Sequence, residues 1–403
     1  MFEVRELRRW SWVVLAALPA VGACGGESQS GHGGEASARL ELSAPEAAFP
    51  EAFSSIAGLR ELIDGRLYVS DRLGQALLLV DLDGSTVDTI GRVGGGPGEY
   101  ASPGDLFPWR GDSTLLVDMG NTRFTPVGPD GGFGISSPLM TQDGESMKLV
   151  IPEGTDRHGS VYFQARNFSM GAGGPGGLPD SALVVRWNPE TDRTDTVAAL
   201  TQPERKIQRG GGNVMMMPIP FSPSDAWAVS WDGTVGVARG SGFRVEWTNT
   251  EGVATIGNEI EYQPLVIEQA DKDEWLEARA NPAGGGMFIT MSAGGGGGGN
   301  VRAAPAPRGA RMEGPQVADE DWPEVKPPFP PSAVSATPEG DLWVRRHVSP
   351  GAPPEYDVFD GNGERVRTVI LAENSNVVGF GNGVVYVART DDDDLQWLER
   401  YKR

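Results

Sequence analysis

Six apolar triplets, each preceded by a tight-turn dipeptide, constrain the fold of this chain more than any other feature. The triplets begin at residues 67, 115, 161, 235, 342 and 385, and the dipeptides before them include Asp64-Gly65 and Asn382-Gly383. The middle residues of successive triplets are 48, 46, 74, 107 and 43 residues apart. A period of about 40–50 residues is typical of units built from four short strands, so the two long intervals predict insertions.

The turn residues divide each unit into four strands. In the first unit we expect strands at 58–62, 66–71, 76–81 and 86–90, with a second tight turn at Asp83-Gly84. Asp-Gly and Asn-Gly tolerate the positive φ angles that two-residue hairpins require. Gly and Pro, with 57 and 31 residues, exclude a helical bundle, whereas 39% apolar residues are enough to fill a core.

The last unit contains only three strands, at 376–380, 384–389 and 395–401. We expect segment 38–42 to supply its fourth strand, because such a closure removes an exposed sheet edge. Residues 94–100 (GGGPGEY) and 115–123 (LLVDMGNTR) resemble the linker and the strand end of NHL and TolB-like β-propellers. The resemblance implies an all-β, six-bladed β-propeller with four-stranded antiparallel blades, closed by an N-terminal strand that joins the last blade.

The first 23 residues have the pattern of a secretory signal. Three arginines precede an apolar run from residue 10 to residue 23, which is too short to span a bilayer as an ordinary helix. The run ends at Cys24, the only cysteine, and here the chain resembles a bacterial lipoprotein signal in which this cysteine carries the lipid. The alternative is an ordinary signal peptide with a leftover thiol. We expect residues 24–37 to form a flexible tether and residues 38–403 the propeller.

The residue after the cysteine is Gly25 and not an aspartate. In this respect the chain resembles bacterial lipoproteins that are sorted to the outer membrane. We therefore expect the protein in the cell envelope, on the periplasmic or the surface side. The formal charge of −21 argues against nucleic-acid binding, which needs a cationic face. An acidic body should not adhere to anionic lipids by itself, so the acyl chains would hold it. One Cys and three His predict neither a Cys-cluster nor a His-rich metal site, and we expect no cofactor.

The connections that are longer than a minimal propeller needs all belong to one class of loop. In a propeller, the loops between blades and the loops between second and third strands share one face, which we call the insertion face; the other is the short-turn face. The long segments are 91–103, 136–147, 167–181, 200–221, 258–330 and 349–354. All belong to the first class, which predicts that the insertion face carries function. Within 258–330 we expect a helix at about 264–279 and then a Gly- and Pro-rich loop, either packed on the rim or acting as a lid over the channel.

Candidate ligand-binding residues lie where second strands reach the insertion face. They are Asp71, Asp118, Arg123, Arg166, Arg239, Arg345 and His347. A ring of Asp and Arg could bind an anionic or zwitterionic ligand through forked guanidinium contacts. The alternative is that these residues pair with one another or cap loop backbone. The four consecutive aspartates at 391–394 could bind calcium through their carboxylates. Four adjacent side chains cannot all point at one ion, however, so we favour the interpretation that they are solvated surface charges.

No set of residues for nucleophilic catalysis stands out. His32 falls in the tether and His158 in a tight turn on the short-turn face, which leaves His347 without a located partner. The sequence therefore predicts a lipid-anchored, non-catalytic propeller that binds a small molecule, a peptide or a protein on its insertion face. The alternative is a divalent-metal-dependent hydrolase or lactonase, because gluconolactonase-like propellers share the architecture and hold a cation with Glu, Asn and Asp. Those ligands have no assigned residues here.

Overall fold

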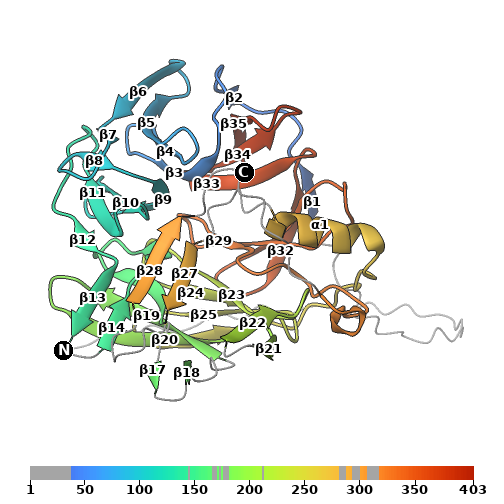
Figure 1. The fold of residues 1–403 in the computed structure, drawn as a ribbon. Coiled ribbons are helices and arrows are strands. Elements are labelled where there is room, and N and C mark those ends of the chain that lie inside the picture. Colours follow the sequence, from blue (N-terminus) through green and yellow to red (C-terminus); the bar gives the residue numbers. More distant parts are fainter. Residues whose placement is uncertain are drawn as a thin grey trace, which may run out of the picture. The chain divides into compact units, whose positions relative to one another are not determined.

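Six sheets form the blades of a β-propeller, which confirms the expected all-β six-bladed fold (Figure 1). The computed structural model describes residues 38–143, 146–165, 170–171, 174–175, 181–210, 213–280, 287–292, 300–305 and 317–403. Among these residues, no helix is long and apolar enough to cross a bilayer.

The blade strands have the following bounds, from the innermost strand outward. Blade 1 is β3 (Ile56–Glu61), β4 (Leu67–Asp71), β5 (Ala76–Asp81) and β6 (Thr86–Ile90); blade 2 is β9 (Pro103–Pro108), β10 (Thr114–Asp118), β11 (Arg123–Val127) and β12 (Ser137–Pro138). Blade 3 is β15 (Gly154–Thr155), β16 (Val161–Ala165), β19 (Ser181–Asn188) and β20 (Arg193–Thr201); blade 4 is β23 (Ala226–Val229), β24 (Val235–Ala238), β25 (Val245–Thr248) and β26 (Ala254–Ile256). Blade 5 is β29 (Val334–Ala336), β30 (Leu342–Arg345), β31 (Glu355–Phe359), β32 (Arg365–Ile370) and β1 (Ala38–Glu41); blade 6 is β33 (Ser375–Gly381), β34 (Val384–Thr390), β35 (Gln396–Lys402) and β2 (Ala47–Ala48).

The apolar triplets form the second strand of every blade, as the turn chemistry predicts. The preceding turn contains a glycine with positive φ in each case, for example Gly65 at +87° and Gly340 at +97°. The triplet side chains are almost fully buried; Tyr68 and Val344, for example, expose no surface. Second strands are covered on both sides because each blade packs against two neighbours, so their sequence is continuously apolar.

Packing between blades closes the ring. The described residues contain six hydrophobic clusters, and each cluster combines side chains from two adjacent blades. The cluster between blades 6 and 1, for example, includes Phe49, Phe53, Leu67 and Leu398. Since apolar burial contributes roughly 25 cal/mol per Å², these seams are the main source of stability.

The expected closing strand was placed wrongly. Residues 38–42 do not lie beside 395–401; β1 instead pairs in parallel with β32 and adds a fifth strand to blade 5. The fourth strand of blade 6 is β2, which pairs antiparallel with β35. The physical reason is the aromatic pair that follows β2: Phe49 and Phe53 are buried in the closing seam, whereas Leu42 is buried between blades 5 and 6. The N-terminal segment still closes the ring, and the assignment of faces follows from the strand order within the blades.

The inserted helix begins later than residue 264. Helix α1 runs over Gln269–Ala280, because the preceding segment forms an antiparallel pairing instead of a helical turn. The amide of Ile267 donates to the carbonyl of Glu324, and the amide of Lys326 donates to the carbonyl of Leu265. This two-stranded neck joins the start of the insertion to its end.

Candidate functional site

The insertion face carries nearly all structure that does not belong to a blade. Five two-stranded ribbons lie in connections of this face: β7 (Arg92–Val93) with β8 (Glu99–Tyr100), β13 (Met140–Asp143) with β14 (Ser146–Leu149), β17 (Met170–Gly171) with β18 (Gly174–Pro175), β21 (Arg205–Gly210) with β22 (Asn213–Pro218), and β27 (Met287–Ser292) with β28 (Asn300–Pro305). Helix α1 and the short 3₁₀ helix η1 (Asp319–Asp321) lie in the connection between blades 4 and 5. The short-turn face contains none of these elements within the described ranges.

Asp71 and Asp118 end the second strands of blades 1 and 2, and their carboxylates bind backbone amides. Asp71 accepts hydrogen bonds from the amides of Ser54, Ser55 and Gly74 at 2.7–3.0 Å. Asp118 accepts from the amides of Ala101, Ser102 and Asn121. Both residues are almost fully buried. Each carboxylate therefore ties the segment that enters its blade to the turn that follows its second strand.

Arg123 fixes the glycine-rich linker that leads into blade 2. Its guanidinium donates to the carbonyls of Gly95, Gly96 and Glu99 at 2.8–3.2 Å. Its Nε lies 3.8 Å from Oδ2 of Asp118, so these two candidates are brought together. Both groups hold the linker in place.

Arg239 joins three elements of blades 3 and 4. It donates to Oδ2 of Asp225 at 2.7 Å, to Oε2 of Glu246 at 2.5–2.8 Å and to the carbonyl of Ala199 at 2.9 Å. Burial lowers the pKa of Arg239, but the hydrogen bonds to Glu246 and Asp225 outweigh burial and raise the net pKa. The guanidinium therefore stays charged and occupied by protein carboxylates.

Arg345 and His347 have a different environment. Arg345 is exposed at the end of β30, and no ion pair of its side chain is found within the described part of the chain. His347 is half-buried in the following loop, and its Nε2 is buried without a hydrogen-bond partner. Burial lowers the pKa of His347 to about 4, and the positive charges of Lys326 and Arg345 act in the same direction. Arg166 and Cys24 lie outside the residues whose side chains are described.

A buried ion pair attaches the insertion to the propeller beside His347. Nζ of Lys326 lies 2.5 Å from Oδ1 of Asp271 and donates to the carbonyl of Val348 at 2.7 Å. The side chains of Lys326 and Asp271 are 5% and 3% exposed. Oδ2 of Asp271 also accepts from the amide of Glu268 at 2.8 Å, which caps the first turn of α1. The start of α1 is therefore anchored to blade 5.

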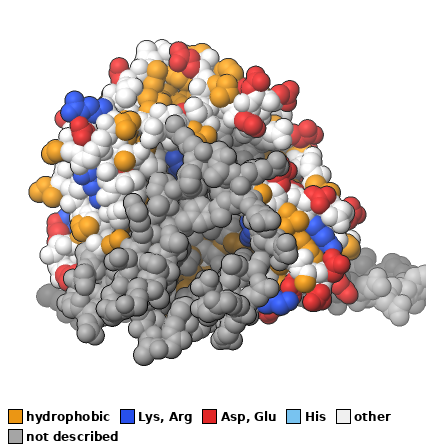
Figure 2. All heavy atoms as spheres, in the orientation of Figure 1, with side chains coloured by type: hydrophobic (Ala, Val, Ile, Leu, Met, Phe, Trp, Pro, Cys, Tyr) orange, Lys and Arg blue, Asp and Glu red, His pale blue; other side chains and the backbone are white. Residues whose placement is uncertain are grey.

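Aromatic rings and cations continue from His347 along the insertion. The Phe221 ring lies 5.6 Å from the His347 ring and 6.3 Å from Trp322, and Trp322 meets Trp275 edge to face at 5.5 Å. Lys272 and Arg279 of α1 lie over Trp322 and Trp275, at 5.3 and 3.6 Å from the ring centroids. We call Lys272, Trp275, Arg279 and Trp322 the cation–aromatic ledge. In Figure 2 the region of α1 shows hydrophobic side chains next to basic and acidic ones.

Sequence reasoning missed this ledge. Trp275 lies in the segment 264–279, which is interpreted there only as a helix, and Trp322 lies in a Pro-rich stretch without periodicity. The signal that could have found it is the i, i+3, i+4, i+7 spacing of Lys272, Trp275, Leu276 and Arg279, which places cations and an aromatic ring on one helix face.

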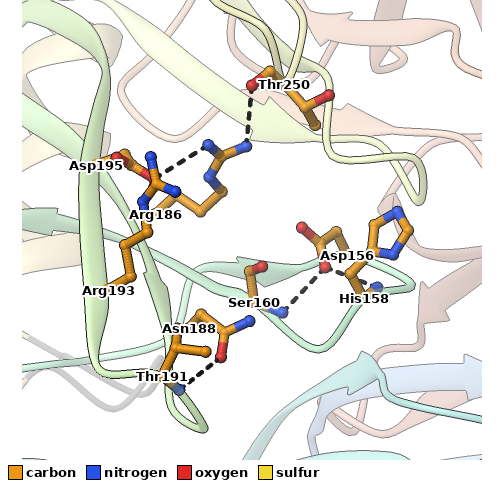
Figure 3. A pocket seen from close by; sticks show the side chains of 9 residues that line it. All are labelled: Asp156, His158, Ser160, Arg186, Asn188, Thr191, Arg193, Asp195 and Thr250. Atoms are coloured by element: carbon orange, nitrogen blue, oxygen red, sulfur yellow. Dashed lines mark hydrogen bonds and ion pairs between the residues drawn. The ribbon is translucent and has the colours of Figure 1, made fainter.

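A hollow of about 510 Å³ lies on the short-turn face, between blades 3 and 4. Figure 3 shows its lining residues: Asp156, His158, Ser160, Arg186, Asn188, Thr191, Arg193, Asp195 and Thr250. Arg186 donates to Oδ2 of Asp195 at 3.2 Å and to the carbonyl of Thr250 at 3.3 Å. The hydrogen bond from Arg186 lowers the pKa of Asp195. The charges of Arg186 and Asp195 in the hollow therefore neutralise one another. His158, which also lines the hollow, lies in the short turn where the sequence predicts it.

The aspartate run 391–394 forms the hairpin between β34 and β35. Asp391 accepts hydrogen bonds from the amides of Asp393 and Leu395 and from the indole of Trp397, so its carboxylate stabilises the turn. Within the described ranges, no three His, Cys, Asp or Glu side chains are grouped closely enough to hold a metal ion.

No protein-family model matches the sequence, and no curated protein is similar to it. Solved structures are similar in fold at low identity. A gluconolactonase from Xanthomonas campestris is 12% identical, with 88% of this chain and 91% of that chain covered and a TM-score of 0.40. Regucalcin, a calcium-binding protein from Agrobacterium tumefaciens, is 11% identical over 91% and 97% of the two chains, with a TM-score of 0.39. A member of the DUF4221 family from Bacteroides vulgatus is 8% identical over 89% and 98%, with a TM-score of 0.46.

Proposed function

We propose that this protein is a lipid-anchored, non-catalytic scaffold of the cell envelope that binds a ligand or a protein through its insertion face. The observation that carries the proposal is the placement of all five ribbons and α1 in connections of one face. Binding groups usually sit on loops that a rigid scaffold holds. Asp71, Asp118, Arg123 and Arg239 supply that rigidity here, because each ties loop backbone or adjacent strands together.

The course of the N-terminal segment supports an anchor on the opposite side. β1 runs parallel to β32, and β32 starts at the short-turn face. The chain therefore enters blade 5 from the short-turn face. A tether to a lipidated Cys24 would therefore join the propeller at its short-turn face.

Two measurements test the two parts of this proposal. Metabolic labelling with a fatty acid should mark the protein, and Cys24→Ala should abolish the label; a label that persists contradicts the anchor. For the binding face, a photo-cross-linking amino acid is placed at Leu395 on the insertion face or at Ile63 on the short-turn face, which are 39% and 86% exposed. Cross-linked products in envelopes should form from position 395 only. Products from position 63 alone, or from neither position, contradict the proposed face.

The second candidate function is a divalent-metal-dependent hydrolase or lactonase, for which Asp105 on the innermost strand of blade 2 is the residue to test. Asp105 lies on β9, the innermost strand of blade 2, where it is accessible to solvent but closely surrounded by protein; this surrounding protein raises the pKa of its carboxyl, and the positive charge of Arg72 partly offsets the rise. Elemental analysis of the purified protein and a lactone-hydrolysis assay with wild type and Asp105→Asn test it. Turnover that is lost in Asp105→Asn would support the hydrolase, and a metal-free protein without turnover would dismiss it.

A further inference from the structure

The two cations of the cation–aromatic ledge form no ion pair among the described residues, although four acidic residues lie on the same helix. In a chain with a formal charge of −21, most of the described arginines on the insertion face pair with acids, as Arg239 does with Glu246 and Arg346 with Asp357. Within the described part of the chain, Lys272 and Arg279 instead lie over tryptophan rings without an ion pair, and Arg345 forms no ion pair either. Lys272 and Arg279 therefore remain available on the ledge, and the charge of Arg345 acts beside it, where it helps to lower the pKa of His347.

The contacts of the ledge are continuous because each contact shares a residue with the next. Arg279 lies over Trp275, Trp275 meets Trp322, and Trp322 contacts Phe221. Phe221 in turn contacts His347, two residues after Arg345. The chain of contacts thus runs from the ledge on α1 to His347, in the loop that follows β30 of blade 5.

The ledge is held rigidly. The buried pair of Lys326 with Asp271 anchors the first turn of α1, and the neck pairing of Ile267 with Glu324 fixes the segment that directly follows Trp322. Phe221 has a φ of +49°, a left-handed conformation that a bulky residue adopts only when its surroundings impose it. A preorganised surface loses less conformational entropy when a partner binds.

The electrostatics of Arg279 favour an anionic partner. Arg279 is exposed, but its guanidinium lies against the ring of Trp275, and the partial desolvation lowers its pKa with no carboxylate among the described residues to counteract the effect. A guanidinium that is partly desolvated without a counter-charge interacts more strongly with an incoming carboxylate than one in bulk water does. The adjacent indole rings offer apolar area, and Trp and Arg together are typical of the residues that dominate protein–protein binding energy.

We propose that the cation–aromatic ledge binds an acidic peptide segment, with carboxylates on Lys272, Arg279 and Arg345 and an apolar side chain against Trp275 and Trp322. This inference rests on the proposed function, since it names the partner class of the same face. An open ledge suits a segment of chain, whereas small ligands are usually enclosed in a cavity. Because the protein as a whole is strongly acidic, an acidic partner is attracted only locally, and binding should weaken steeply as salt rises.

The test is a calorimetric titration of the mature chain with a peptide of about twelve residues in which Glu alternates with Leu and Tyr. A peptide with Gln in place of Glu measures the contribution of charge, and polygalacturonate tests for a polyanionic saccharide instead. We expect the Glu peptide to bind, the Gln peptide to bind at least about tenfold more weakly, and the affinity of the Glu peptide to fall between about 0.02 and 0.3 M salt. Equal binding of both peptides, or binding of the saccharide alone, overturns the proposal.

Variants locate the binding on the ledge. Arg279→Gln and Lys272→Gln remove the charge but keep the first part of the aliphatic stem and a polar end, and each should weaken binding of the Glu peptide several-fold; the double variant should weaken it about tenfold or more. Arg193→Gln is the matched control, because Arg193 is 76% exposed, pairs with Asp195 and lies at the hollow of the short-turn face. Unchanged thermal unfolding shows that the variants are folded. Equal affinity of the double variant and wild type overturns the proposal.

The two proposals fail separately. If no peptide binds while the cross-linked product from position 395 still forms, the peptide inference fails and the binding function of the face stands. If neither is observed, the binding function fails as well.

Discussion

The tyrosine that spans the closing seam offers a sharp test of how the ring is held together. The hydroxyl of Tyr386 in blade 6 donates to Oε2 of Glu61 in blade 1 at 3.0 Å. Tyr68 makes the equivalent contact from blade 1 to blade 2, but to the carbonyl of Gly128 at 2.5 Å. A hydrogen bond to a charged group contributes about 1.5–3 kcal/mol and a neutral one about 0.5–1.5 kcal/mol. At neutral pH, Tyr386→Phe should therefore lower the free energy of unfolding by about 2 kcal/mol and Tyr68→Phe by about 1 kcal/mol.

The pH dependence gives this prediction its sign. Burial raises the pKa of Glu61, so the folded protein holds the carboxyl proton more tightly than the unfolded chain does. Its contribution to stability is complete below the unfolded pKa and is lost as pH rises through the higher folded pKa. The stability of Glu61→Gln relative to wild type should therefore increase from about pH 4 to pH 7, and the difference between the two tyrosine variants should shrink at low pH.

Urea unfolding followed by tryptophan fluorescence measures these differences, provided that the slope of each transition is unchanged. The matched control is Tyr68→Phe, which removes the same hydroxyl at a seam without a carboxylate. If Tyr386→Phe loses no more stability than Tyr68→Phe at pH 7, or if the advantage of Glu61→Gln does not grow with pH, the reasoning is refuted.

Three further variants test the attachment of the insertion, the ring closure and the buried histidine. Lys326→Met leaves the carboxylate of Asp271 buried without its counter-charge and should cost about 3–5 kcal/mol, whereas the double change with Asp271→Leu should recover much of the loss; additive losses in a double-mutant cycle would contradict this. Phe53→Ala removes a buried ring from the closing seam and should cost about 3–5 kcal/mol in denaturant unfolding, whereas Leu40→Ala on the fifth strand of blade 5 should cost clearly less; the opposite order would mean that β1 closes the ring. In the folded protein the pKa of His347 is about 4, below its value in the unfolded chain, so the stability of the protein should fall as pH drops from about 6.5 towards 4. His347→Gln should flatten this part of the curve of stability against pH, and an unchanged curve would argue against burial of His347 as the cause.

The blades are predictable from sequence because their determinants are local. Tight turns need glycine at positive φ, and a strand packed between two blades needs a continuous apolar run, so both signals lie within a few residues of each other. The strands expected at 66–71, 76–81 and 86–90 accordingly match β4, β5 and β6 within one residue. The concentration of long connections on one face follows from the same strand count.

The partners of the candidate site residues depended on chain segments far away in the sequence. Asp118 binds amides at positions 101 and 102, and Arg239 binds Asp225 and the carbonyl of Ala199, and nothing in the local pattern specifies those contacts. The structure places these side chains against the protein itself, and a role for them in binding a ligand stays a prediction.

Sequence alone determined the repeat, the fold and the face that carries the insertions, because alternation and turn chemistry act over a few residues. Only the tertiary structure decided that β2 closes the ring, that the neck pairing delays the start of α1, and that Trp275 and Trp322 meet beside cations. Each of these outcomes is a competition between segments separated by tens to hundreds of residues. It is settled by which apolar side chains fill a seam once the blades have packed, and no local pattern records that result.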